Sequence, residues 1–384
     1  MTGMVSMLTK AEKVEKMDLE EARKVIEETD KEMAELFERR MDAVRDVAGY
    51  KTERGLQVED KDRETALIKE LSDLIKDEEL KPFYVQFLQN NIDVSKRWQH
   101  RLMDGVRVAY CGVEGAFSGI AAKRFFPDGT TVPYNSFEAA YESVVDGTCN
   151  TAVLPIENSN AGEIGQVIDL MFLGDLYVNG VYELFISQNL LGIPGANKED
   201  ITKVISHPQA LTQCRNYIKD HDLEIKTSEN TALAAKEVME LNDIHTAAIA
   251  SQEAADLYGL QVLDHDINES RMNTTRFAVF SKAENRNTDK KKGSAFILLF
   301  TVKDEVGGLA KAVSVISAFD FNMRVLRSRP MKGLLWHYYF YAELEGDDRS
   351  DRGRQMLRTL KGVCHTVKVA GRYSTADDIK DPEL

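Results

Sequence analysis

The chain has 384 residues, which is long enough for two or three domains. Its hydrophobic content of 43% and its 8 prolines are typical of a folded protein and exclude a disordered chain. The net charge of -14 excludes a general nucleic-acid binder because the phosphates would be repelled, although a local basic pocket can still hold a small anion.

The four cysteines, Cys111, Cys149, Cys214 and Cys364, are scattered along the chain without metal-ligand spacing. This pattern indicates buried free thiols in a reducing compartment. The first 17 residues contain no long apolar core, and no apolar run reaches the ~20 residues that would span a membrane. We therefore expect a cytoplasmic protein with no membrane segment, no metal and no cofactor.

Composition divides the chain into three folded regions. Residues 18–104 carry helical patterns throughout, which predicts an all-α domain. Residues 105–283 alternate short apolar runs with amphipathic segments, which is typical of an α/β domain. A polar linker at 284–292 leads to a compact strand–helix region at 293–373, and an acidic tail follows. The sequence thus predicts a multidomain protein.

Polar side chains interrupt the apolar stripes of the three helices predicted in the first region. The first helix runs from about Asp18 to Lys51, the second begins near Asp60, and the third contains Leu88, Ile92 and Leu102. Charges on a buried stripe are costly unless they are paired. The polar residues on the three stripes are Arg23, Asp30, Arg40, Lys51, Asp60, Arg63, Glu64, Ser95 and Gln99.

Two explanations fit these residues. Polar residues on a helix seam can fix register and oligomeric state, or they can line a cavity that binds an anion. We favour the cavity because several of the residues are basic and the set comes from three different helices.

Residues 18–104 resemble the all-helical chorismate mutase family. The positions of that family's site are occupied by Arg23, Arg40, Lys51, Asp60, Arg63, Glu64, Ser95 and Gln99. The resemblance implies a dimer whose long helices exchange, so that Arg23 serves the partner's site. It also implies that arginines hold the two carboxylates of chorismate, that Lys51 and Gln99 donate to the ether oxygen, and that Glu64 orients the hydroxyl. Such a rearrangement needs positioning and charge stabilisation but no nucleophile.

The second region contains two similar helix–strand–polar units. One is the helix 136–146, the strand 151–156 and Glu157-Asn158-Ser159; the other is the helix 231–241, the strand 246–250 and Ser251-Gln252-Glu253. Two such units predict two lobes with a cleft between them, since polar residues at the carboxyl ends of parallel strands face a crevice. We expect crossing strands at 177–187 and 260–267, which places 273–277 near the hinge.

A glycine-rich turn at 112–119 follows the strand predicted at 107–111. Such turns can bind anions through backbone N–H groups, but this one matches neither the dinucleotide fingerprint nor a phosphate loop. A turn that serves only packing is an equal alternative.

Three motifs of the second region resemble those of the prephenate dehydratases: 155–159, 206–214 and 273–277. A periplasmic-binding-type ligand sensor is the rival interpretation of a two-lobed chain. The resemblance implies removal of water and CO2 from prephenate to leave phenylpyruvate. Thr275 would deliver a proton to the departing hydroxyl within a hydrogen-bonded relay. The other residues that the resemblance places in this site are Glu157, Asn158 and Gln213 as cleft partners, and Ser118, Ser159 and Arg276 as substrate contacts.

Three points stay open at this stage. Arg276 could instead tie down its loop, and His207, which precedes Pro208, is a better candidate for a turn than for an acid. The turn at 116–119 and the Ala210-Leu211 pair are also similar to arogenate dehydratases, which act on the aminated substrate. A fused mutase makes prephenate locally, which favours prephenate.

The third region predicts a strand at 294–302, a helix at 307–318, strands at 322–329 and 334–345, a helix at 349–361 and a strand at 363–369. This βαββαβ order is the α+β ferredoxin-like plan. Two of its motifs resemble the ACT regulatory domain, which implies that phenylalanine binds between paired domains and inhibits the enzyme. The predicted effector residues are Gly307, Gly308, Leu309, Ala310, Asn322, Arg327, Ser328, Arg329 and Pro330.

This region departs from the ACT pattern at two positions, because Arg327 stands where a glutamate is usual and Gly308 where an alanine is usual. Charge reversal in a ligand motif can weaken or alter binding. A module that serves dimerisation alone is the alternative.

As a whole, the chain resembles the bifunctional chorismate mutase/prephenate dehydratase (P-protein) family of phenylalanine biosynthesis. The partners implied are chorismate and prephenate, phenylalanine as effector, and further copies of the chain in a homodimer or larger assembly. Three alternatives remain: an arogenate dehydratase, a catalytically silent amino-acid sensor, and a mutase with a structural tail.

Overall fold

The structure, a computed structural model, describes residues 17–54, 58, 60–270, 272–284, 293–331 and 337–374. The chain forms two compact units, Met1–Met103 and Asp104–Leu384. None of the helices in the described ranges is long and apolar enough to cross a membrane. The acidic tail and all of the linker predicted at 284–292 except Glu284 lie outside the described residues.

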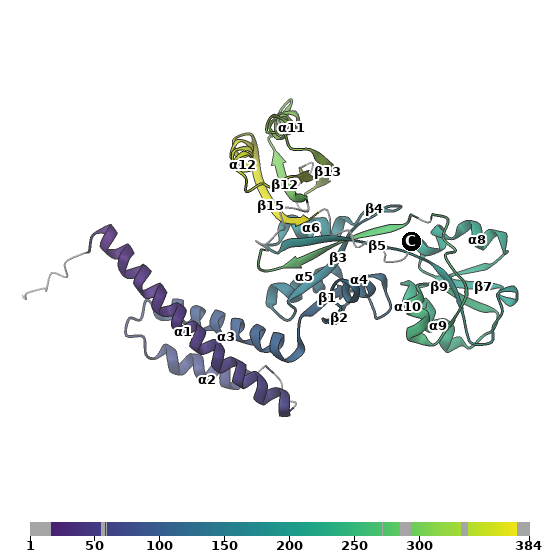
Figure 1. Cartoon of the computed structure of the whole chain (residues 1–384), viewed down its shortest axis with the longest axis horizontal. Coiled ribbons are helices and arrows are strands. Elements are labelled where there is room, and N and C mark those ends of the chain that lie inside the picture. Colours follow the sequence, from purple (N-terminus) through teal and green to yellow (C-terminus); the bar gives the residue numbers. More distant parts are fainter. Residues whose placement is uncertain are drawn as a thin grey trace, which may run out of the picture. The chain divides into compact units, whose positions relative to one another are not determined.

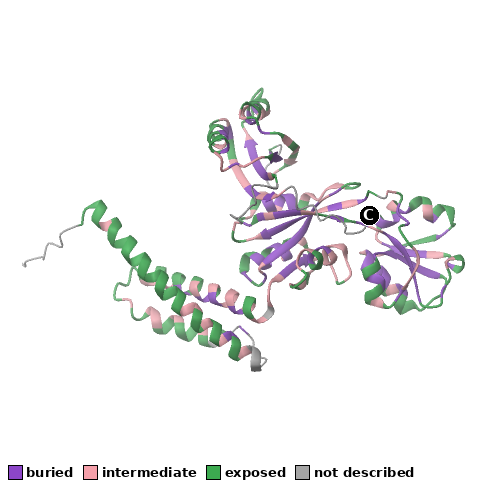
Figure 2. Cartoon of the chain, in the orientation of Figure 1, coloured by how far each residue is buried: buried purple, intermediate pink, exposed green. Residues whose placement is uncertain are grey.

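The first unit is helical, as the sequence predicts, with α1 (Leu19–Arg54), α2 (Lys61–Ser72) and α3 (Lys81–Asp104). Asp60 begins α2 by accepting a hydrogen bond from the backbone N–H of Arg63 at 3.1 Å. Much of this unit is exposed, whereas the strands of the second unit are buried (Figure 2).

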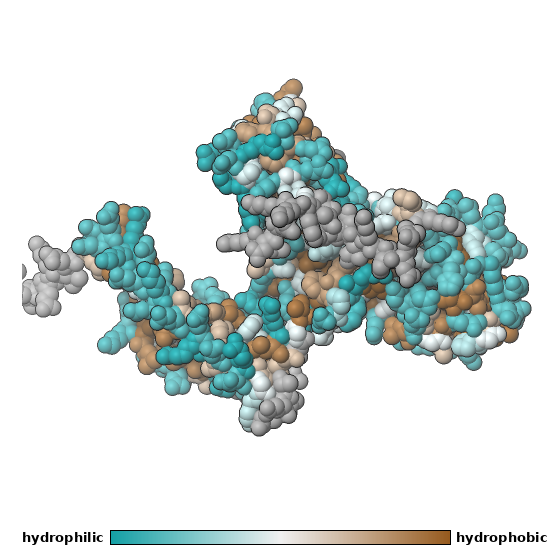
Figure 3. Space-filling view, in the orientation of Figure 1, coloured by the Kyte–Doolittle hydropathy of each residue, from teal (hydrophilic) through white to brown (hydrophobic). Residues whose placement is uncertain are grey.

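Large apolar side chains reach the surface of the helical unit (Figure 3). Phe83 is 71% exposed and Leu36 is 52% exposed, and Met33, Phe37 and Phe87 are exposed by 44–46%. Contiguous apolar surface of this kind is uncommon on a monomer and is typical of an interaction face.

The first lobe of the second unit combines parallel strand pairs with an antiparallel strand, β11, at its centre. β1 pairs β2 and β3 in parallel, and β11 lies antiparallel between β3 and β5. Side chains of α5 and α6 pack on one face of the sheet and those of α4 on the other. The elements are β1 (Arg107–Cys111), α4 (Phe117–Phe125), β2 (Thr130–Tyr134), α5 (Phe137–Asp146), β3 (Thr151–Asn158), β4 (Gly162–Glu163), α6 (Gly165–Leu173), β5 (Tyr177–Phe185) and β11 (Thr274–Ser281).

The second lobe has its own sheet, in the order β10-β6-β9-β7-β8, and its own apolar core (Figure 1). Its elements are β6 (Asn189–Gly192), β7 (Lys203–Ser206), α7 (Pro208–Gln213), α8 (Arg215–Asp220), β8 (Glu224–Thr227), α9 (Thr231–Leu241), β9 (Thr246–Ala250), α10 (Gln252–Tyr258) and β10 (Gln261–Asp264). The repeated unit has a local cause: Ser136 and Asn230 cap α5 and α9, and both helices end on a left-handed residue.

One predicted crossing strand is wrong. The segment 260–267 does not cross between lobes, because β10 pairs antiparallel with β6 inside the second lobe. The chain returns to the first lobe in the segment that follows β10, which runs beside the segment before β6. The backbone N–H of Ile267 donates to the carbonyl of Gln188, and that of Ile186 donates to the carbonyl of Asn273, each at 2.8 Å.

The C-terminal module (residues 293–374) has the predicted βαββαβ order and its own apolar core. Its strands lie in the order β13-β14-β12-β15, all antiparallel. The elements are β12 (Ser294–Val302), α11 (Gly308–Ala318), β13 (Met323–Pro330), β14 (Tyr338–Glu345), α12 (Asp351–Val363) and β15 (Cys364–Ser374). The first part of the strand predicted at 334–345 lies outside the described residues.

β15 joins the C-terminal module to the first lobe by pairing in parallel with β5, Gly371 opposite Val178, which makes one ten-stranded sheet. A Cβ atom on Gly371 would lie 2.1 Å from the carbonyl oxygen of Val178. The close approach of these two strands therefore requires glycine at this position.

Candidate active sites

A cavity of about 160 Å³ lies among the three helices of the first unit. Four cationic side chains face two carboxylates in its lining, so the cavity suits an anion. Seven of the eight predicted site residues line it: Arg40, Lys51, Asp60, Arg63, Glu64, Ser95 and Gln99. Lys96 also lines it and was not predicted, because nothing in a helical repeat distinguishes it from a surface lysine.

The polar groups of this cavity are held in place by contacts between helices. The Arg40 guanidinium donates to the Oγ of Ser95 and to the carbonyl of Asn91 at 3.3 Å, and burial lowers its pKa. Lys51 Nζ donates to the carbonyl of Val58 at 2.7 Å, and Lys96 Nζ lies 3.0 Å from a carboxylate oxygen of Glu64.

Gln99 differs from its neighbours in the cavity. Its side-chain oxygen is buried, and no described residue lies in hydrogen-bonding position to it. A buried acceptor without a partner costs about 1–3 kcal/mol, which a ligand with a donor group would offset.

Arg23, the eighth predicted residue, is exposed and does not line this cavity. It precedes Arg40 by 17 positions on α1, a separation of about 25 Å along a helix. One small ligand cannot contact both side chains of the same chain.

A second cavity, of about 510 Å³, lies between the two lobes of the second unit. Four predicted residues line it: Ser118, Asn158, Gln213 and Thr275. Among the described residues of its lining there is no lysine or arginine. The first residues of α4, the cap His207 of α7, and the Asn230-Thr231 start of α9 face it instead. Helix N-termini present backbone N–H groups that favour anions.

A chain of side-chain amides holds the Thr275 hydroxyl at the wall of this cavity. Asn158 Nδ2 donates to Thr275 Oγ1 at 3.0 Å and to Asn273 Oδ1 at 2.9 Å, and Asn273 Nδ2 donates to Gln213 Oε1 at 3.1 Å. Asn158 Oδ1 accepts from the backbone N–H groups of Asn160 and Ala161 at 3.0 and 2.9 Å, which fixes the orientation of its amide.

Asn273, from the motif 273–277, is fully buried and links both lobes through this chain of amides. An accepted hydrogen bond occupies a lone pair of the Thr275 oxygen and leaves its own proton available to a ligand.

Glu157, Ser159 and Arg276, which were also predicted as site residues, are not among the residues that line the cavity. Successive strand residues face opposite sides, so Asn158 and Thr275 on one face put Glu157 and Arg276 on the other. The hydroxyl of Ser159 instead accepts from the backbone N–H of Thr274 at 3.0 Å, which closes the turn.

Arg276 is bound on the far face by the C-terminal module. Its two terminal nitrogens donate to the two carboxylate oxygens of Glu343 at 2.9 and 2.8 Å, and one also donates to Glu157 at 3.1 Å. Burial lowers the pKa of Arg276, but the hydrogen bonds and charge of Glu343 outweigh it and raise this pKa above its ordinary value. The alternative that Arg276 ties down its segment therefore fits the geometry.

His207 lines the cavity and is also a cap, as the turn interpretation expects. Its Nδ1 accepts from the backbone N–H of Gln209 at 3.2 Å, so the neutral ring carries its proton on Nε2. Burial lowers the pKa of His207. At neutral pH the ring is therefore a neutral donor rather than an acid.

The effector residues predicted on strand β13 of the C-terminal module lie on both of its faces. Arg327 pairs with Glu157, and Arg329 donates to Asp169 at 3.0 Å and to Glu163, which lines the cavity between the lobes. Ser328 and Pro330 lie on the opposite, exposed face of β13. Asn322 instead donates to the carboxylate of Glu345 at 2.8 Å.

The glycine turn of the module is sterically constrained. Gly307 has a φ of +79°, and a Cβ atom on Gly308 would lie 2.4 Å from the carbonyl oxygen of Lys303. Leu309 and Ala310 follow in the first turn of α11.

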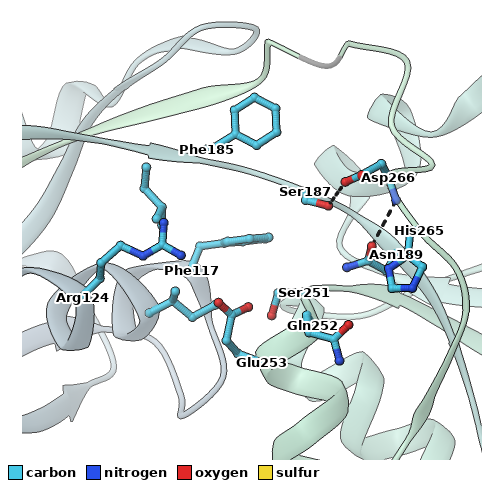
Figure 4. Close-up of a pocket in the computed structure, with 12 residues that line it drawn as sticks. Phe117, Arg124, Phe185, Ser187, Asn189, Ser251, Gln252, Glu253, His265 and Asp266 are labelled. Atoms are coloured by element: carbon cyan, nitrogen blue, oxygen red, sulfur yellow. Dashed lines mark hydrogen bonds between the residues drawn. The ribbon is translucent and has the colours of Figure 1, made fainter. Parts of the chain in front are cut away.

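A smaller cavity of about 210 Å³ lies on the other side of the segment that connects the lobes (Figure 4). Phe117 lines both cavities and therefore separates them. Arg124 of α4 and Glu253 of α10 face this smaller cavity from the two lobes, and Ser187 and Asn189 face it from the connecting segment.

Comparison with protein families gives two matches. A model of prephenate dehydratase matches residues 108–285, and a model of chorismate mutase type II matches residues 22–100. A bifunctional chorismate mutase/prephenate dehydratase of Enterobacter agglomerans is 30% identical over 88% of this chain and 91% of its own length. An arogenate dehydratase/prephenate dehydratase of Arabidopsis thaliana is 33% identical over 70% of this chain and 72% of its own.

Two solved structures resemble the chain. Prephenate dehydratase from Arthrobacter aurescens in complex with L-Phe has a TM-score of 0.65 at 25% identity, over 71% of this chain and 91% of its own. A protein described as a quorum-quenching acylase, GqqA, has a TM-score of 0.66 at 30% identity, over 71% of this chain and 98% of its own.

Proposed function

The chain belongs to the family of bifunctional chorismate mutase/prephenate dehydratases, and from that membership we propose that it converts chorismate to prephenate and prephenate to phenylpyruvate. The observation that carries the proposal is that two separate cavities each hold the polar groups that one step needs. We assign the first step to residues 18–104 and the second to residues 105–283. Residues 293–373 are assigned to a ferredoxin-like ACT domain. The free thiols fit a cytoplasmic enzyme.

The first step requires the dianion chorismate to fold into a compact chair. Arg40 and Arg63 bind its carboxylates. Lys51 and Gln99 donate to the ether oxygen, where negative charge develops as the bond breaks. The Gln99 oxygen has no partner among the described residues, so rotation of the amide by 180° would place its NH2 group there as a donor to the ether oxygen. Fixed donors of this kind lower the barrier by positioning and electrostatics alone.

The second step removes the ring hydroxyl and the ring carboxylate of prephenate. As the ring carboxylate leaves as CO2, its electron pair enters the ring and the C–O bond breaks, and the departing hydroxyl takes the proton of Thr275 and leaves as water. Asn158 donates to the Thr275 oxygen and stabilises the charge that develops there, and water entering the cavity then returns a proton to Thr275. Amides do not resupply protons, so the chain from Gln213 to Thr275 positions the hydroxyl rather than acting as the relay expected from sequence. The helix N-termini of α4 and α9 favour the substrate's negative charge.

One assay tests both steps. Chorismate is added to the purified full-length chain, and prephenate and phenylpyruvate are measured over time. We expect prephenate to appear first and phenylpyruvate to follow. Accumulation of prephenate alone would support the alternative of a mutase with a structural tail. Formation of neither prephenate nor phenylpyruvate would support the alternative of an amino-acid sensor.

We propose that the apolar face of the helical unit, formed by Met33, Leu36, Phe37, Phe83 and Phe87, binds a second copy of the chain. Arg23 lies far from the cavity of its own chain and is exposed for contact with that copy. A dimer would bury the apolar face and bring Arg23 into the partner's cavity, where a third arginine suits a dianion.

We further propose phenylalanine as a feedback inhibitor. A similar structure, from Arthrobacter aurescens, is a complex with L-Phe. In this chain Arg327 and Arg329 of the effector motif connect the C-terminal module to Glu157 and Glu163 beside the cavity. Calorimetric titration should show heat on adding phenylalanine, together with reduced dehydration; no heat and unchanged dehydration would contradict feedback.

A further inference from the structure

The segment from Ile186 to Asn189 connects the lobes and separates the two cavities of the second unit. Ile186 and Gln188 line the larger cavity, whereas Ser187 and Asn189 line the smaller one (Figure 4). This alternation is that of an extended chain. It places the Gln188 side chain in the cavity that also contains Thr275.

The neighbours of Gln188 already hold this segment in place. The hydroxyl of Ser187 donates to the carboxylate of Asp266, whose backbone N–H donates to Asn189 Oδ1 at 3.1 Å (Figure 4). The Gln188 backbone contributes too, because its N–H donates to Asn268 Oδ1 at 3.1 Å. The connection between the lobes therefore does not depend on the Gln188 side chain.

The Gln188 side chain is 3% exposed, yet its oxygen is buried without a hydrogen-bond partner among the described residues. Gln213 in the same cavity differs, since its oxygen accepts from Asn273. Leaving a buried acceptor unsatisfied costs about 1–3 kcal/mol. A cost of this size without structural benefit indicates a group that is satisfied only when a ligand is bound.

Position along the chain indicates which part of the ligand Gln188 meets. Thr275 lies opposite Leu184 in the pairing of β11 with β5, and Gln188 comes four residues after Leu184. Four residues span at most roughly 14 Å. Both residues line the same cavity, so with Thr275 at the ring hydroxyl the other end of prephenate, which carries the α-keto acid side chain, can extend toward Gln188.

We propose that Gln188 binds the α-keto or α-amino group of the substrate side chain and thereby determines which of the two substrates the dehydratase accepts. This inference rests on the proposed dehydratase function. Prephenate and arogenate differ only at this group, a ketone that accepts hydrogen bonds in one and an ammonium that donates them in the other. A rotatable amide offers both a donor and an acceptor, so Gln188 admits both substrates.

Substitution of Gln188 by glutamate tests the specificity. A carboxylate accepts but does not donate, so Gln188→Glu should favour the ammonium. We expect the ratio of kcat/KM for prephenate to that for arogenate to fall by about tenfold or more relative to the unsubstituted chain. An unchanged ratio would overturn the role of Gln188, whereas turnover of neither substrate by the unsubstituted chain would overturn the proposed function itself.

Substitution by methionine separates binding from structure. Gln188→Met keeps a flexible side chain of similar length and removes both donor and acceptor. It should lower kcat/KM for both substrates, yet melt at the same temperature or higher, because it removes a buried oxygen without a partner. A lower melting temperature with unchanged kinetics would show that Gln188 is structural.

Ser187→Ala is the matched control, since Ser187 adjoins Gln188 but lines the other cavity. It removes the hydrogen bond to Asp266 and should lower the melting temperature without changing the substrate ratio. A ratio that shifts equally in Ser187→Ala and Gln188→Glu would overturn the proposal. Mutase turnover serves as the internal standard for all three variants.

Discussion

Thr275 illustrates how a weak acid becomes useful when its surroundings fix one geometry. A threonine hydroxyl rotates freely in water, but here Asn158 donates to its oxygen, and Asn158 is itself fixed by the backbone of the next turn. Thr275 is 8% exposed, so the hydroxyl works in a place with little competing water. Positioning and a low local dielectric together strengthen the hydrogen bond that Thr275 offers.

Replacing Thr275 with alanine should lower dehydration by roughly 10²- to 10⁴-fold, the range for loss of a positioned proton donor. Thr275→Ser should retain part of the activity because the hydroxyl remains. Steady-state kinetics with added prephenate measures both. Thr274→Ala is the control, since that side chain donates to the carbonyl of Met272 within its turn and is not among the residues that line the cavity. Equal dehydration in Thr275→Ala and Thr274→Ala would contradict the role of Thr275.

For single residues, the sequence predicted which residue types lie near the site better than it predicted which way their side chains point. Strand alternation separates Thr275 from Arg276, but it does not tell which face meets the ligand. The deciding partner of Arg276 is Glu343, 67 residues away in another module, and no local pattern indicates that contact. Gln188 was missed for a related reason. A polar residue between two strands is typical of an ordinary connection, and only the structure shows that its buried oxygen has no hydrogen-bond partner among the described residues.

Helix α1 is the element that the sequence predicted most fully. Its repeat of 3.6 residues places Arg40 and Lys51 on one side, and both line the cavity of the helical unit. Arg23 precedes Arg40 by 17 residues, which turns it about 100° around the axis and puts it too far along the axis to share a ligand with them. A periodic pattern predicts which face of a helix a residue lies on. It does not predict that a second copy of the chain completes the site.

Mixing two inactive variants tests the exchange of Arg23. Arg23→Ala and Arg40→Ala should each lose most mutase activity while still dehydrating added prephenate. In a mixed dimer, one site carries both substitutions and the other carries neither. Random re-association of equal amounts should therefore restore about a quarter of the unsubstituted activity, as expected for a two-fold dimer with shared sites.

The measurement is mutase turnover after unfolding and refolding the two variants together. Each variant refolded alone is the control. If mixing restores nothing although the separate variants refold as dimers, Arg23 acts in its own chain or not at all.

The C-terminal module and the first lobe share a cluster of buried charges. Glu343 is 1% exposed and binds Arg276, Tyr341 and Tyr373. Burial raises the pKa of Glu343, but its hydrogen bonds from Arg276 and the two tyrosines outweigh this effect and hold the pKa below its ordinary value. The cluster is thus stable only while the carboxylate is ionised.

This cluster predicts a pH dependence of stability. Because the folded-state pKa of Glu343 is lower than the unfolded one, its stabilisation is fully present above the unfolded value and is lost as pH falls through the folded value. Scanning calorimetry between pH 7 and pH 3 should show a fall in melting temperature that is smaller in Glu343→Gln. At pH 7 that variant should lose less than the roughly 3–5 kcal/mol for breaking a buried ion pair, because Arg276 keeps its ion pair with Glu157.

Glu345→Gln is the matched control on the same strand. Its side chain is 47% exposed and lies 3.7 Å from Arg324, a surface pair that contributes little. A pH profile that Glu343→Gln and Glu345→Gln change to the same extent would contradict the assignment to Glu343.

A charge reversal tests the contact between Arg327 and Glu157. Arg327→Glu places two carboxylates together and should lower the melting temperature by roughly 2–4 °C for each kcal/mol lost. Arg327→Gln removes the charge of the pair without adding a carboxylate beside Glu157, so it should lower the melting temperature by less than Arg327→Glu does. Equal melting temperatures for Arg327→Glu and Arg327→Gln would show that the charge of Arg327 does not hold the module to the lobe.

At the scale of the second unit, strand β5 connects the C-terminal module to the segment between the lobes. Gly371 of the C-terminal module pairs with Val178 near its beginning, Thr275 lies opposite Leu184 near its end, and Gln188 follows within the cavity. Gly371→Ala would force β15 away from β5. The absence of a side chain at this one position therefore allows the C-terminal module to pair with the strand that leads to Gln188.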